Sequence, residues 1–146
     1  MLINPKFRLY SFVNGLYMSP IQHGIQTAHL VGEMAVKNTM IFQEWAQYDK
    51  TIVILNAGNH KGLNDIYEVL EEYRHDFPVG IFHEDVESLG GIITCVGIIL
   101  PQQYYNVTYD SNFNEWVYDD GEGERRYGEN HRFFKLISMM KNLRLA

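Results

Sequence analysis

Gly91-Ile-Ile-Thr-Cys-Val-Gly-Ile-Ile-Leu100 is the longest apolar run of the chain, and it carries no charged residue. A segment of this kind predicts a strand that is buried on both faces, as in the centre of a sheet covered by helices. The run is too short to cross a bilayer as a helix, which takes about 20 apolar residues. We therefore expect residues 91–100 to form the central strand of an α/β fold.

Strand and helix signals alternate ahead of this run. Clusters of β-branched and aromatic residues predict three more strands, over residues 8–14, 51–56 and 77–82. Ser19-Pro20 is a helix start, with serine as N-cap and proline in the first turn. The expected helices cover residues 20–38, 39–48, 64–75 (capped by Asn64) and 130–142. The fold class that follows from this alternation is α/β.

The first helix divides into two arcs at helical spacing. The arc expected to be buried is apolar and small-sided, and consists of Ile21, Gly24, Ile25, Ala28, Val31, Gly32, Ala35 and Val36. The arc expected to face outward is polar, and consists of Gln22, Gln26, His29, Glu33 and Lys37. Its N-terminal end follows the first strand, where open α/β sheets place their ligands.

Residues 102–128 interrupt the alternation with aromatic, acidic and glycine residues. Two segments, 104–109 and 113–118, flank Asp110-Ser-Asn112 and predict a β-hairpin. The hairpin either covers the domain's own core, forms a homodimer contact, or offers aromatic rings to another partner. We expect one domain over residues 1–146 with this hairpin inserted before the last helix.

The net charge of −6 is unevenly distributed. Residues 1–61 carry five Lys/Arg and three Asp/Glu, residues 62–124 one and fourteen, and residues 125–146 six and one, so the three parts have charges of +2, −13 and +5. The acidic middle disfavours long nucleic acids, which bind basic faces. The first residues lack the apolar core of a signal peptide, and the lone Cys95 allows no disulfide within the chain. We expect a cytoplasmic protein without a membrane partner.

Several segments resemble, in order, the motifs of type II peptidyl-tRNA hydrolases. Gly15-Leu-Tyr-Met-Ser-Pro-Ile-Gln-His-Gly-Ile-Gln-Thr-Ala-His-Leu30 is similar to the family's first motif, Asp-Leu-Lys-Met-Gly-Lys-Gly-Lys-Ile-Ala-Ala-Gln-Cys-x-His-Ala, with matches at Leu16, Met18, Gln26 and His29. Phe42-Gln-Glu-Trp45 ahead of residues 51–55 resembles the family's tryptophan-bearing helix end and second strand. Residues 91–101 resemble its last strand, and residues 134–145 its closing helix. The resemblance implies the family's architecture, a small mixed four-stranded sheet with helices on both faces.

The chain departs from the family where the resemblance places the chemistry. Gln22 stands at the presumed catalytic lysine and Gly15 at an acidic position, and no lysine occurs between Lys6 and Lys37. Ester hydrolysis on a tRNA ribose needs stabilisation of a developing oxyanion, and a neutral group in place of a charged one costs about 2–4 kcal/mol. We expect a divergent member that binds a nucleotide-containing ligand, a nucleotide or the 3′ end of tRNA, with the family activity weak or lost.

The candidate ligand-binding residues are Asn14, Gln22, Gln26 and His83. An alternative, an active hydrolase with a His/Asp arrangement, assigns catalysis to His23, His29 and Asp85. Both sets have plainer interpretations, because polar helix stripes are typical of solvated faces and histidines of ordinary loops. No spacing matches a metal signature, so neither a metal nor a cofactor is expected. A second alternative is a module that binds protein or sequesters nucleotides through residues 102–128.

Overall fold

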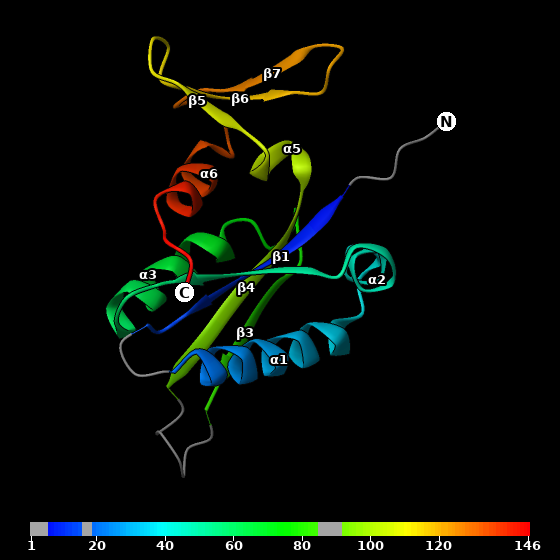
Figure 1. Ribbon diagram of the computed structural model, residues 1–146, viewed down its shortest axis with the longest axis vertical. Coiled ribbons are helices and arrows are strands. Elements are labelled where there is room, and N and C mark those ends of the chain that lie inside the picture. Colours follow the sequence, from blue (N-terminus) through cyan, green and yellow to red (C-terminus); the bar gives the residue numbers. More distant parts are fainter. Residues whose placement is uncertain (1–5, 16–18, 85–91) are drawn as a thin grey trace.

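The computed structural model describes residues 6–15, 19–84 and 92–146 (Figure 1). In chain order the elements are β1 (Phe7–Val13), α1 (Pro20–Lys37), α2 (Met40–Glu44), the π-helical turn η1 (Trp45–Asp49), β2 (Thr51–Asn56), α3 (His60–Glu71), β3 (Val79–His83), β4 (Ile93–Pro101), α5 (Gln102–Tyr105), β5 (Thr108–Asp110), β6 (Glu115–Asp119), β7 (Glu124–Tyr127) and α6 (Phe134–Lys141). They form a mixed α/β fold with a four-stranded main sheet and a second, three-stranded sheet.

The main sheet has the strand order β2-β1-β4-β3. β1 and β2 are parallel, while β4 runs antiparallel to both β1 and β3. β4 is buried from Thr94 to Pro101, which confirms its prediction as a central strand. β1, β2 and β3 therefore point in one direction, and their C-terminal ends lie at one edge of the sheet.

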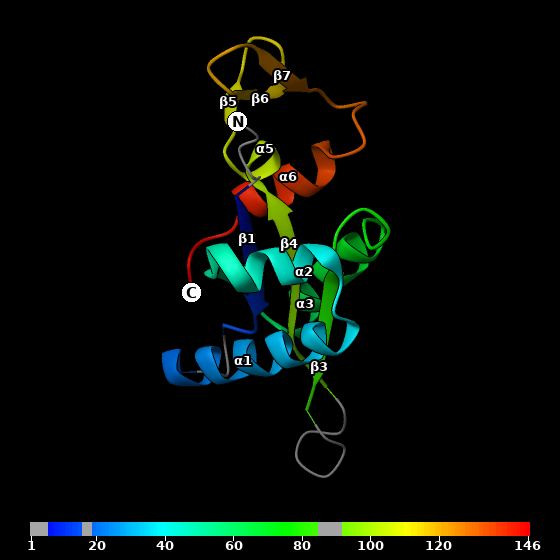
Figure 2. The same ribbon diagram turned by 90° about the vertical axis from the view of Figure 1, so that its right-hand side faces the viewer.

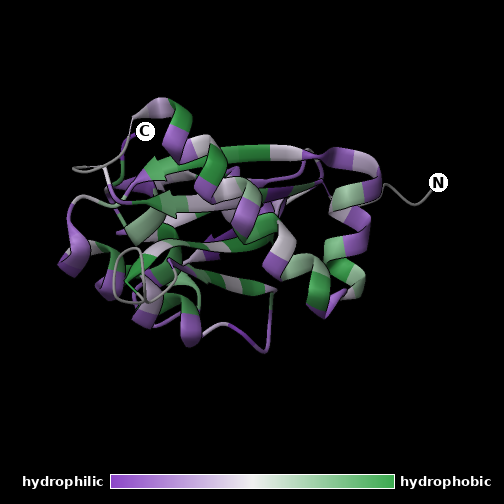
Figure 3. Ribbon diagram, turned by 90° about the horizontal axis from the view of Figure 1, so that it is seen from below, coloured by the Kyte–Doolittle hydropathy of each residue, from purple (hydrophilic) through white to green (hydrophobic). Residues whose placement is uncertain are grey.

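Helices cover both faces of the main sheet, as predicted. Side chains alternate along a strand, so β1 sends Leu9 and Val13 to the face that α1 and Trp45 cover. On the other face, Phe12 packs with α3 and α6. Figure 3 shows hydrophobic colour recurring along the strands and alternating colours on the helices around them.

Two glycines shape the face that α1 covers. Gly80 and Gly97 are paired opposite each other in β3 and β4. A Cβ atom at Gly80 would lie 2.6 Å from Met34 Cγ, and one at Gly97 would lie 2.5 Å from Leu30 Cδ2. The two glycines thus form the trough in which the long side chains of α1 are buried.

The buried side of α1 differs from the prediction. The helix buries His23, Thr27, Leu30 and Met34, whereas Ile21 is 77% and Val36 83% exposed. A hydropathy pattern cannot anticipate this, because the deciding features belong to the sheet. The glycine trough accepts Leu30 and Met34, and Ser11 of β1 lies 2.7 Å from the Thr27 hydroxyl. The expected apolar arc faces mostly outward, and Gly24 and Gly32 have no neighbour within 4 Å of an added Cβ.

Three helix boundaries also require correction. α3 begins at His60 rather than after Asn64, because the Asn59 side chain is the N-cap and accepts the Gly62 N–H at 2.9 Å. Residues 39–48 do not form one regular helix, since α2 ends at Glu44 and η1 follows. The last helix begins at Phe134 instead of residue 130.

The inserted segment contains the predicted hairpin, the antiparallel pair β5–β6 around residues 110–115, and adds a third strand, β7, that was not predicted. The strand expected over 104–109 is a helical turn up to Tyr105, and β5 begins only at Thr108. Tyr118 and Tyr127 belong to the core that α3 and α6 share, so this sheet packs on the rest of the fold. It lies at the end of the molecule away from α1 (Figure 2).

Candidate functional site

The C-terminal edge of β1 and β2 is a topological switch point. The two strands are parallel neighbours, but α1 follows β1 onto one face of the sheet and α3 follows β2 onto the other. The segments after the two strands diverge there, and in open α/β sheets this divergence is where ligands bind. Figure 1 shows the N-terminal ends of both helices beside this edge.

Backbone hydrogen bonds tie the two strand ends together. The Ala57 N–H donates to the Val13 carbonyl at 2.8 Å, and the Gly15 N–H donates to the Gly58 carbonyl at 3.0 Å. A Cβ at Gly15 would lie 2.2 Å from Asn56 Oδ1, so this position accepts only glycine without rearrangement. Gly58 has φ +80°, a conformation that glycine adopts at no steric cost. The edge is thus closely packed, with defined backbone positions.

Asn14 and His60 connect the end of β1 with the start of α3. Asn14 is fully buried, and its Nδ2 lies 3.2 Å from His60 Nδ1. His60 is the first residue of α3 and is half-buried. The predicted ligand-binding residue Asn14 therefore acts on the site by orienting His60, which the sequence analysis did not select.

His23 lies in the first turns of α1, on the side that faces the sheet. It is 7% exposed, and among the described residues its Nε2 atom has no hydrogen-bond partner. Buried polar atoms in folded proteins are nearly always hydrogen-bonded, so an orphan of this kind marks a place where a partner of another sort is needed. His23 thus combines burial with unused hydrogen-bonding capacity.

Gln22 points to the opposite, exposed side and closes the helix cap. Its Oε1 accepts the Ser19 N–H at 3.0 Å, and its own N–H donates to Ser19 Oγ at 3.3 Å. This reciprocal pair is a capping box. The side chain at the position of the family's lysine therefore holds the helix start.

Gln26 and His29 lie over β4 and β3 of the main sheet. Gln26 Nε2 donates to Glu84 Oε1 at 3.0 Å, and its Oε1 accepts from the Thr94 hydroxyl at 2.9 Å. The His29 ring stacks on Phe82 at a centroid distance of 4.5 Å. Both candidates are engaged with β3 and β4, and His29 does not share a face of α1 with the buried His23.

His83 ends β3 at the same edge of the sheet and is exposed. Asp85, the proposed carboxylate of a His/Asp arrangement, lies outside the described residues. Of the predicted residues that the structure describes, Asn14, His23 and His83 lie at this edge of the main sheet, yet they do not form one converging cluster.

A small polar group is buried beneath α1. Ser11 Oγ lies 2.7 Å from Thr27 Oγ1 and 3.1 Å from Cys95 Sγ. Burial raises the pKa of the Cys95 thiol to about 11, against hydrogen bonds from Ser11 and Thr27 that lower it. A thiol with so high a pKa is a poor nucleophile at neutral pH, so this group is structural.

His60 and Lys61 are the residues of this edge that sequence reasoning missed. They form the first turn of α3, which the choice of Asn64 as cap placed in a loop. The available signal was Asn59 itself, a preferred N-cap residue three positions ahead of Gly62. Glycine in a first turn lowers helix propensity, but here a Cβ at Gly62 would lie 2.2 Å from the Ala57 carbonyl oxygen.

Within residues 6–15, 19–84 and 92–146, no group of three or more His, Cys, Asp or Glu side chains is arranged to hold a metal ion. The same described residues contain no helix with the length and apolarity to cross a membrane.

Compared with models of known protein families and with curated protein sequences, the chain matches none of them. The resemblance to type II peptidyl-tRNA hydrolases therefore stays a prediction, carried by the motifs quoted above.

Proposed function

We propose that this chain is a divergent type II peptidyl-tRNA hydrolase-like protein that binds a nucleotide-containing ligand at the C-terminal edge of β1 and β2. The observation that carries the proposal is the switch point, where α1 and α3 leave two parallel neighbours on opposite faces of the sheet. Such an edge brings helix N-termini together, the arrangement used for phosphate-bearing ligands.

The α3 end of this edge suits the phosphate better than the α1 end. At α1, Pro20 has no N–H, and the Gln22 N–H already donates to Ser19 Oγ. At α3, the Gly62 N–H is likewise taken by the Asn59 side chain, but no proline stands in the first turn, which carries the partial positive charge of a helix N-terminus. The side chain of Lys61 in this turn is 82% exposed and pairs with Asp65 at 3.0 Å. A phosphate at the first turn of α3 gains both contributions.

The base or sugar of the ligand has hydrogen-bonding partners nearby. His60 is held by Asn14 at 3.2 Å, and His23 Nε2 is buried with no partner in the part of the chain that the structure describes. A ligand that donates to or accepts from His23 would remove the cost of an unsatisfied buried nitrogen, about 1–3 kcal/mol.

Weak or lost hydrolase activity is part of the proposal. The residue at the lysine position, Gln22, is neutral and is engaged in the helix cap. It supplies no fixed positive charge for an oxyanion, and a contact of that kind is worth about 10²–10³ in rate.

Calorimetric titration of the intact chain with AMP, ADP, a cyclic dinucleotide and a CCA trinucleotide tests this function. We expect at least one of these ligands to bind, and Lys61→Gln to weaken that binding about tenfold through loss of a charge-assisted contact. Lys50→Gln is the matched control, because Lys50 precedes β2 at the opposite edge of the sheet. Absence of binding for all four ligands, or equal weakening in both variants, would contradict the proposal.

One observation favours hydrolysis by a histidine as a second candidate function, namely that the Nε2 atom of the buried His23 has no hydrogen-bond partner among the described residues. Turnover of peptidyl-tRNA that is lost in His23→Ala and kept in His29→Ala would establish it. Turnover that survives both changes would exclude a catalytic role for either histidine.

A further inference from the structure

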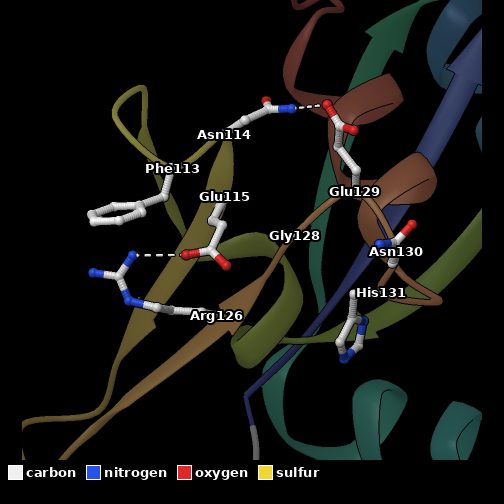
Figure 4. Close-up of a pocket in the computed structure, with 8 residues that line it drawn as sticks. All are labelled: Phe113, Asn114, Glu115, Arg126, Gly128, Glu129, Asn130 and His131. Atoms are coloured by element: carbon white, nitrogen blue, oxygen red, sulfur yellow. Dashed lines mark hydrogen bonds and ion pairs between the residues drawn. The ribbon is translucent and has the colours of Figure 1, made fainter.

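The second sheet has a cavity of its own, far from the edge of the main sheet described above. Its volume is about 630 Å³, and its walls include Phe113, Glu115, Arg126, Glu129 and His131. Strands β6 and β7 form one side, and the segment that leads into α6 forms the other (Figure 4). A volume of this size falls in the range of sites that bind small ligands or inserted side chains.

Arg126 occupies one wall but is fully engaged with acidic neighbours. Its guanidinium pairs with Asp110 at 3.1 Å, Glu115 at 3.0 Å and Glu124 at 3.3 Å. The preceding residue, Arg125, does not line the cavity. Its guanidinium donates to Gln103 Oε1 at 2.7 Å. The positive charges of Arg125 and Arg126 are therefore already used by partners within the chain.

Glu115 and Glu129 supply the acidic character of the opening. One oxygen of Glu115 binds Arg126, while its Oε2 lies 3.3 Å from where a Cβ would stand at Gly128, so a larger residue there would crowd it. Glu129 Oε1 accepts from Asn114 Nδ2, which fixes that carboxylate on the facing wall. The lining itself carries two carboxylates, Glu115 and Glu129, against one guanidinium, a net charge of −1. Asp110 and Glu124, which pair with Arg126 from outside the lining, add acidic character beside the cavity.

The exposed ring of Phe113 lies beside these carboxylates, and the two together suit a side chain that has an apolar stem and a positive charge. Phe113 is 69% exposed, and its ring already attracts a guanidinium, since Arg126 Cζ lies 5.6 Å from its centroid. An aromatic face and carboxylates together favour arginine or lysine side chains, whose methylene stems cover apolar surface while their charges pair.

From this geometry we infer that the cavity between β6, β7 and residues 128–131 is a docking site for a basic side chain of a partner protein. The position favours a protein partner, because the second sheet that carries the cavity lies at one end of the molecule (Figure 2). The inference does not rest on nucleotide binding, since it uses no residue of the main sheet.

The test uses two acetylated, amidated peptides and amide chemical-shift mapping on the intact chain. One peptide is Gly-Arg-Gly-Arg-Gly, and the other has neutral citrulline in place of both arginines. We expect the arginine peptide to shift the signals of Phe113, Glu115 and Gly128, and the citrulline peptide to bind at least about tenfold more weakly.

Charge-neutralising variants distinguish binding in the cavity from a general attraction of the peptide to the acidic chain. Glu129→Gln keeps an oxygen for Asn114 and should weaken the arginine peptide about fivefold, and Glu115→Gln should act in the same direction. Glu122→Gln changes the net charge equally but lies in the turn at the far end of β6, so it should have no effect. Equal weakening by Glu122→Gln and Glu129→Gln, or the absence of peptide-induced shifts in this region, would overturn the inference.

Discussion

The two sheets of this protein are held together by different interactions. The main sheet is covered by helices on both faces and buries Leu30 in a trough made by Gly80 and Gly97. The second sheet packs one side on the shared core through Tyr118 and Tyr127, while its strands are joined across the surface by the ion pairs of Arg126. Burial of apolar area is worth far more than exposed ion pairs. The main sheet is thus the structural scaffold, and the second sheet presents a charged surface.

The largest effect on stability is expected where α1 enters the main sheet. Leu30 is fully buried, so Leu30→Ala should lower the free energy of unfolding by about 3 kcal/mol, from lost transfer energy and the cavity left behind. Phe113→Ala removes a larger side chain beside the second sheet, but this side chain is 69% exposed, so the free energy of unfolding should change little. Urea denaturation of both variants measures the contrast, and equal losses would refute the difference between the sheets.

Alkaline pH should weaken the main sheet through Cys95. Burial raises the pKa of this thiol from 9.0 to about 11, so the folded chain holds the proton more tightly than the unfolded chain. The resulting stability is fully present below pH 9 and is lost as the pH rises from 9 through 11, by on the order of 2 kcal/mol.

Unfolding measured from pH 8 to 11 should therefore show a flatter decline for Cys95→Ala than for the unaltered chain. Parallel slopes, or rapid reaction of the folded thiol with a thiol reagent at pH 9, would show that Cys95 is more accessible than this burial implies.

Substitution of a glycine on the outward face of α1 should stabilise the protein, whereas substitution of a glycine beneath α1 should destabilise it. Gly24 has no neighbour within 4 Å of an added Cβ, so Gly24→Ala should raise the free energy of unfolding by about 1 kcal/mol through helix propensity. Gly97→Ala should lower it, because its Cβ would lie 2.7 Å from the Tyr10 carbonyl oxygen. Thermal melts of the two variants check the signs, and a destabilising Gly24→Ala would mean that this face of α1 is covered.

The smallest effect is expected in the second sheet. Arg126→Gln removes ion pairs that are largely solvated, so the melting temperature should change less than in Gly24→Ala. Any change should shrink further at high salt, which screens the remaining carboxylates. A large, salt-independent loss would show that Arg126 is a structural centre of this sheet.

Sequence patterns were sufficient for the main sheet because its signals are local. The uncharged run of β4 and the Ser19-Pro20 start of α1 each determine their element nearly alone. The buried side of α1 was not predictable in this way, since it depends on Gly80, Gly97 and Ser11, which are distant in sequence. β7 was missed because Glu124–Tyr127 contains polar residues that pair only in the folded sheet.

The candidate site was predictable in place but only partly in its residues. The first helix was expected to begin just after the first strand, which implied a site near residue 14, and Asn14, His23 and His83 do lie at that edge of the main sheet. The first turn of α3 was missed because Gly62, a poor helix former, argued against a helix that starts at Asn59. Whether Gln22 and Gln26 face a ligand or the protein depends on partners such as Ser19 and Glu84, which no spacing reveals.

The most direct test of the central claim is an amide chemical-shift map of the intact chain during titration with the nucleotide that binds best in calorimetry. The proposed function predicts shifts at Asn14, Gly58 and Lys61, at the C-terminal edge of β1 and β2, while the signals of Phe113 and Gly128 stay in place. Shifts confined to the second sheet, or none at saturating nucleotide, would contradict a nucleotide site at the edge of the main sheet.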